Sequence, residues 1–310
     1  MSSPKSPPAK RQRMEDASIT RENADIARSK TWRSDGNVIL QAGNTQFRVH
    51  WSVLALHSPV FRDMQGLPQP PDEPTVDGCP IVNLSDNPDD VEYLLKVLYN
   101  PTFLSEKKLS LAVVGALIRL GRKYDFKDLF DWAVGRLTSR FPTTLDEFDA
   151  VKPDGLSIER YPGIHFDIAA LASENGILTL LPSVYYWLVS TNSMASLIDG
   201  IERGDGTMAH LPNLDMRRCA VGQQRLLTRQ FLPGHTLGAS KYGEGLITRL
   251  SANLDVKALM SPALVLKIHP FCANCTQHAL QYTTTARKKM WETLPAIFDL
   301  PPWNELKNGI

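Results

Sequence analysis

The chain lacks three features that would place it in a specialised class. It has four cysteines in 310 residues, no apolar run of membrane-spanning length, and a net charge of only +1. Few cysteines argue against a disulfide scaffold, and the short apolar stretch at 109–120 is interrupted by Arg119. A near-zero net charge argues against a broad nucleic-acid-binding face. We therefore expect no membrane contact and, without an apolar leader, a nuclear and/or cytoplasmic location.

The small positive charge is concentrated at the N-terminus. Residues 1–33 contain eight Lys or Arg against four acidic residues, so the remainder of the chain carries −3. This segment has almost no large apolar side chains, and we predict a disordered basic tail over 1–33. Prolines precede Lys10, Arg11 and Arg13, a cluster similar to a nuclear import signal. The alternative is a basic tail that only aids solubility.

With 43% hydrophobic residues, the rest of the chain can bury a substantial core. Short β-prone runs at 38–40 and 47–49 flank Gly43-Asn44 and predict a hairpin, and 81–84 predicts a third strand. Helical spacing of apolar residues follows from about 88 to 140. After Pro142 the patterns are helical, with a polar segment at 191–212 expected to be a loop. The sequence therefore predicts an α+β unit over 34–141 and a mainly α-helical region over 142–310.

Several short runs in a fixed order now resemble a known family. Their sequences are Asp35-Gly36-Asn37-Val38, Phe47-Arg48-Val49-His50-Trp51-Ser52-Val53-Leu54, Ser58-Pro59-Val60-Phe61 and Leu120-Gly121-Arg122-Lys123-Tyr124. Together they resemble a BTB/POZ domain over 34–141, whose fold is a small mixed sheet flanked by helices. The whole chain is similar to BTB proteins abundant in mushroom-forming, or basidiomycete, fungi.

The resemblance implies a non-enzymatic protein-interaction protein that forms a homodimer or binds another protein partner. Family dimers use an N-terminal element and the first helix, which places the interaction face here at Trp51, Val53, Leu54 and Phe61. Where many members have Lys or Arg after the histidine, this chain has Trp51, so the family's charged pocket cannot form in the same way. We expect His50 to be a structural residue that links strand to helix.

Two other functions stay open. A substrate adaptor that recruits a cullin scaffold of a ubiquitin ligase is one, although the 65–80 loop matches the cullin-binding motif poorly. A nuclear transcriptional regulator whose tail touches DNA phosphates is the other, and the −3 balance of residues 34–310 argues against it. The sequence has no nucleotide-binding, zinc-protease or serine-hydrolase motif, so no catalytic residue is predicted.

One cluster could bind a metal. Cys272, Cys275 and His278 have the spacing of zinc ligands, and Cys219 could complete a closed structural site. The alternative is that the cysteines are small buried apolar residues one helical turn apart. No other cofactor is expected.

Overall fold

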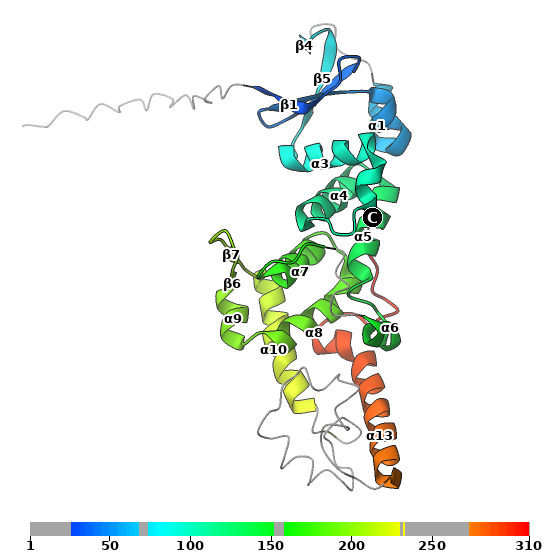
Figure 1. Ribbon diagram of the computed structural model, residues 1–310, viewed down its shortest axis with the longest axis vertical. Coiled ribbons are helices and arrows are strands. Elements are labelled where there is room, and N and C mark those ends of the chain that lie inside the picture. The colour runs from blue at the N-terminus through cyan, green and yellow to red at the C-terminus, as the bar shows by residue number, and fades with distance from the viewer. Residues whose placement is uncertain (1–25, 68–73, 152–157, 230–231, 233–272, 310) are drawn as a thin grey trace, which may run out of the picture.

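The computed structural model describes residues 26–67, 74–151, 158–229, 232 and 273–309, with backbone alone at 273, 275–276 and 278–280. The small sheet lies at one end of an elongated molecule, and helices make up the remainder (Figure 1). Within the described residues, no helix is both long and apolar enough to cross a membrane.

The sheet is mixed, with strand order β1-β3-β2-β5-β4. Its strands are β1 Ala27–Trp32, β2 Val38–Ala42, β3 Thr45–Val49, β4 Thr75–Val76 and β5 Cys79–Leu84. The predicted hairpin is present: β2 and β3 are antiparallel with Leu40 opposite Phe47, and Gly43 in the turn has a positive φ of 53°. A glycine adopts this conformation without steric cost. The predicted third strand is β5, which pairs parallel to β2.

The predicted tail boundary at residue 33 was wrong, because residues 27–32 form strand β1. This strand pairs parallel to β3, with Ala27 opposite Thr45 and Trp32 opposite Arg48. The guanidinium of Arg28 lies 4.4 Å from the centroid of the Trp32 ring. Backbone hydrogen bonds to the open edge of β3 order this polar segment, and composition alone does not reveal such a tertiary contact.

Helices pack below the sheet and complete the first half of the chain. They are α1 Trp51–His57, α2 Pro59–Gln65, α3 Pro88–Tyr99, the 3-10 helix η1 Pro101–Ser105, α4 Leu111–Lys123 and α5 Lys127–Thr138. Ser58 separates α1 from α2: its hydroxyl accepts a hydrogen bond from the Phe61 N–H and donates one to the Tyr124 carbonyl. Pro59 cannot continue α1, so the chain turns there.

The second half is mainly helical, as predicted. It contains α6 Leu145–Ala150, α7 Ile164–Glu174, η2 Leu178–Leu180, α8 Leu181–Thr191, α9 Met194–Asp199, the hairpin β6 Ile201–Glu202 and β7 Met208–Ala209, α10 Asn213–Arg229, α13 Ala273–Glu292 and α14 Leu294–Ile297. The expected loop at 191–212 instead holds α9 and the small hairpin.

The two halves share one apolar core, which runs from Val38 in the sheet to Leu306 near the C-terminus. Polar contacts cross the junction at residue 142: the Ser183 hydroxyl donates to the Pro142 carbonyl at 2.6 Å, and Arg122 Nη1 donates to the Asn175 carbonyl at 2.6 Å. A continuous core means that the helical half is packed onto the sheet-containing half and is not a separate body on a linker.

Candidate interaction surfaces

His50 joins strand β3 to helix α1 and has the structural role expected of it. Its backbone N–H donates to the Tyr99 hydroxyl at 2.9 Å, and its ring Nδ1 lies 3.0 Å from the same oxygen. Its Nε2 lies 3.2 Å from a carboxylate oxygen of Asp35. The pKa of Asp35 is lowered mainly by a backbone hydrogen bond and then by His50. Both ring nitrogens therefore have partners, and the imidazole anchors the end of α3 to the start of α1.

The predicted interaction face differs from the surface that the structure shows. Trp51, Leu54 and Phe61 have exposed fractions of 7%, 0% and 1% and belong to the chain's own core. The rings of Trp51 and Phe61 pack edge to face with centroids 6.4 Å apart. Side chains that are already buried cannot form a docking surface, so three of the four predicted residues are wrong for this role. Only Val53 reaches the surface, where it is half-buried.

The outer face of α1 and α2 carries apolar side chains that the prediction left out. Leu56 on α1 is 71% exposed, and Leu67 just after α2 is 61% exposed. Val53 lies one helical turn before Leu56, and half-buried Val60 is on α2. We call Val53, Leu56, Val60 and Leu67 the α1–α2 face. Helical spacing showed that this region is amphipathic but not which leucine faces inward.

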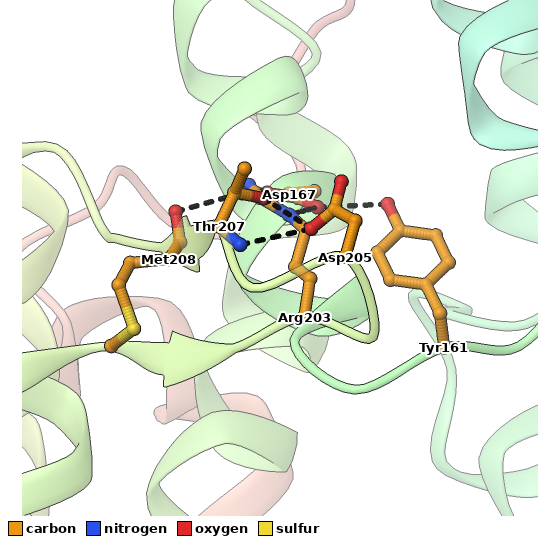
Figure 2. A network of polar contacts seen from close by, with 6 residues as sticks. All are labelled: Tyr161, Asp167, Arg203, Asp205, Thr207 and Met208. Atoms are coloured by element: carbon orange, nitrogen blue, oxygen red, sulfur yellow. Dashed lines mark hydrogen bonds and ion pairs between the residues drawn. The ribbon is translucent and has the colours of Figure 1, made fainter.

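A polar network in the helical half holds the β6–β7 hairpin against α7 (Figure 2). Arg203 makes two hydrogen bonds to the Asp167 carboxylate, at 3.0 and 2.5 Å, and the Tyr161 hydroxyl donates to the same carboxylate at 2.8 Å. Arg203 also donates to the Met208 carbonyl at 2.7 Å, which closes the hairpin. The bond to Asp167 raises the pKa of Arg203, while burial and then the bond to Asp167 raise the pKa of Tyr161.

Beside this network lies an open cavity of about 760 Å³, lined by the segment after α5, the start of α7, α8 and β6. Arg140, Arg160, His165 and Trp187 are among the residues that line it. The rings of His165 and Trp187 stack 5.7 Å apart and within 6° of parallel. Sequence reasoning missed this site because its residues come from four separate segments, and no local motif connects them.

The candidate zinc ligands are only partly described. Cys219 is buried on α10, where burial and then Asp215 raise the pKa of its thiol. Cys272 lies outside the described residues, and for Cys275 and His278 on α13 only the backbone is described. Within the described residues, no group of three potential ligands comes together. The zinc site stays a prediction.

The predicted nuclear import signal cannot be placed in the fold. Lys10, Arg11 and Arg13 lie outside the described residues, so the signal also stays a prediction.

Comparison with known proteins identifies the class of the first half. A family model described as BTB/POZ domain matches residues 30–138, the range that contains the β2–β3 hairpin, the α1–α2 pair and the α3–α5 helices. No curated protein matches the chain. Residues 30–138 therefore form a BTB/POZ domain, a mixed sheet flanked by helices. BTB/POZ domains are protein-interaction domains that mediate self-association and partner binding.

Proposed function

We propose that this chain is a non-enzymatic scaffold that forms a homodimer through the α1–α2 face of its BTB/POZ domain. The observation that carries the proposal is the exposure of Leu56 and Leu67 on that face, at 71% and 61%. Contiguous exposed apolar patches mark protein–protein interaction sites. Two identical faces related by a twofold axis would bury each other's leucines.

The shared core would fix the positions of the two helical halves in the dimer. Because the helical half packs directly on the BTB/POZ domain, two associated domains would hold two helical halves at a fixed separation. A stable interface of this kind buries about 1,200–2,000 Å² in total. The scaffold would then present two copies of any surface on the helical half, which raises the avidity for a partner that contacts both copies.

Replacing Leu56 with aspartate tests the proposed interface. We expect light scattering of the full chain to give the mass of two chains across a hundredfold dilution. Leu56→Asp should raise the dissociation constant at least about tenfold, because it places an unpaired carboxylate in an apolar interface. Since Leu56 is exposed within one chain, the variant should fold normally, which circular dichroism checks.

Leu214→Asp is the matched control, because Leu214 is 51% exposed on α10 in the helical half. It should leave the mass at two chains. Dissociation by Leu214→Asp alone would move the interface to the helical half and contradict the proposed face. A single-chain mass for the unmodified protein would reject homodimerisation and leave the α1–α2 face for a different protein, with a cullin scaffold as the first to test.

A further inference from the structure

We propose that the cavity between α7 and α8 binds a small organic anion, a carboxylate or phosphate attached to an apolar or aromatic body. The volume of about 760 Å³ lies in the range of small-molecule sites, which are usually apolar with a few placed polar groups. The proposal concerns the helical half and is independent of homodimerisation.

The charge of the cavity comes from three sources that act in the same direction. Arg140 and Arg160 both line it. Burial lowers the pKa of Arg140, and the nearby charge of Arg160 lowers it further. The start of α7 forms part of the wall, and the N-terminal end of a helix carries a partial positive charge. None of the described residues that line the cavity is acidic. An anion is therefore the ligand charge that this site favours.

The apolar part of the cavity suits a ring or a short aliphatic chain. Trp187, Ile164, Phe166 and Ile201 line it along with the charged groups. Two contacts hold the Trp187 ring in place: His165 stacks on it, and the Arg140 guanidinium lies 4.8 Å from its centroid. A ligand that places its ring near Trp187 would bring an attached anionic group toward the arginines.

His165 supplies a second, independent observation. Its Nε2 is buried and has no hydrogen-bond partner among the described residues, an arrangement that requires an explanation in a folded protein. Burial, followed by the charges of Arg140 and Arg160, lowers the pKa of His165 to about 4. An anion bound beside these groups would offset the positive field and raise that pKa, so the imidazole reports occupancy of the site.

One wall of the cavity is fixed by a polar network. Tyr161 and Ile201 line it, and both belong to the region held by the Asp167–Arg203 ion pair (Figure 2). Asp167 bonds Arg203 and Tyr161 at the same time, and its carboxylate is not part of the cavity lining. The wall is therefore preorganised, which reduces the entropy lost on binding.

The test is a titration of the full chain with four probes: phenyl phosphate, phenylacetate, benzyl alcohol and inorganic phosphate. Calorimetry gives affinity, and NMR of the His165 imidazole gives its pKa with and without each probe. We expect at least one aromatic anion to bind at least about tenfold more tightly than benzyl alcohol and to raise the pKa of His165. The tighter of the two aromatic anions identifies phosphate or carboxylate as the preferred group.

Arg160→Gln should weaken binding of that anion at least about fivefold, since it removes one charge-assisted contact at an exposed position. Arg217→Gln, at an exposed arginine on α10 outside the cavity lining, is the control and should change nothing. Equal binding of benzyl alcohol, or equal loss in both variants, would overturn the anion site. If inorganic phosphate binds as tightly as the aromatic anions, the proposed apolar part of the ligand is wrong. If Arg160→Gln fails to fold, the pKa of His165 in the unmodified chain, with and without the aromatic anion, still tests the site: an unchanged pKa would contradict anion binding there.

Discussion

Gly222→Ala is expected to lower the free energy of unfolding by about 1–3 kcal/mol, the range typical of overpacked cores. Gly222 is buried on α10, and a Cβ added there would overlap the ring of Phe298 far inside van der Waals contact. Phe298 is itself fully buried, and its ring packs against Tyr185 with centroids 5.4 Å apart. The ring therefore has no space into which it can retreat.

Gly135→Ala is the matched control, since it makes the same chemical change in another helix. Gly135 is exposed on α5, and nothing lies within 4 Å of an added Cβ. Alanine there should stabilise the protein by about 0.5–1 kcal/mol, because it lowers the entropy of the unfolded chain. Urea unfolding followed by circular dichroism measures both. Equal and small effects at the two positions would contradict the close packing of α10 on the C-terminal segment.

Local signals in the sequence predicted local structure well. Thr144 and Glu147 have capping-box spacing, and the Glu147 N–H does donate to the Thr144 hydroxyl at 3.3 Å. A glycine that follows helical spacing, as Gly176 does, is typical of a helix end; it has a positive φ of 65°, with the Ile177 N–H bonded to the Ala172 carbonyl at 2.8 Å. These features depend on residues within one turn of each other, so a short stretch of sequence contains all the necessary information.

Tertiary packing decided the points that the sequence analysis missed. Leu54 and Leu56 are the same residue type in the same short helix, yet one is 0% and the other 71% exposed. Glycine has a low helix propensity, yet α4 continues through Gly121 to Lys123. Its missing side chain lets α5 approach closely, since an added Cβ would lie 3.0 Å from the Phe130 Cβ. Such outcomes depend on partners far along the chain, which no local pattern encodes.

The candidate sites also differ in how far local sequence could predict them. His50 could be recognised as structural because it lies at a strand-to-helix junction without a nearby catalytic partner, and its bonds to Tyr99 agree. The predicted interaction face lies on the same helices as the exposed Leu56, but Trp51, Leu54 and Phe61, which were named for it, are buried. The cavity beside Trp187 could not be predicted, since Arg140 and His165 are 25 residues apart and meet only through folding.

Acid should destabilise this protein through His165, and removing that side chain should abolish this part of the pH dependence. Burial and then the charges of Arg140 and Arg160 lower the pKa of His165 from 6.5 to about 4 in the folded state. As the pH falls below 6.5, the unfolded chain binds a proton that the folded chain does not. Stability is therefore lost between pH 6.5 and 4, by about 2 kcal/mol at pH 5 and about 3 kcal/mol at pH 4.

Other groups also titrate in this range, so the informative quantity is the difference between the unmodified chain and His165→Gln. Urea unfolding at pH 7 and pH 5 measures the stability that each protein loses on acidification. The unmodified chain should lose about 2 kcal/mol more than His165→Gln. His57→Gln, at an exposed histidine on α1, should show no such shift. If His165→Gln and the unmodified chain lose the same stability, then the folded chain does not hold His165 neutral, which contradicts a pKa lowered by burial and by the charges of Arg140 and Arg160. A shift confined to His165→Gln would show that burial of this ring, together with the charges of Arg140 and Arg160 beside it, makes the protein sensitive to acid.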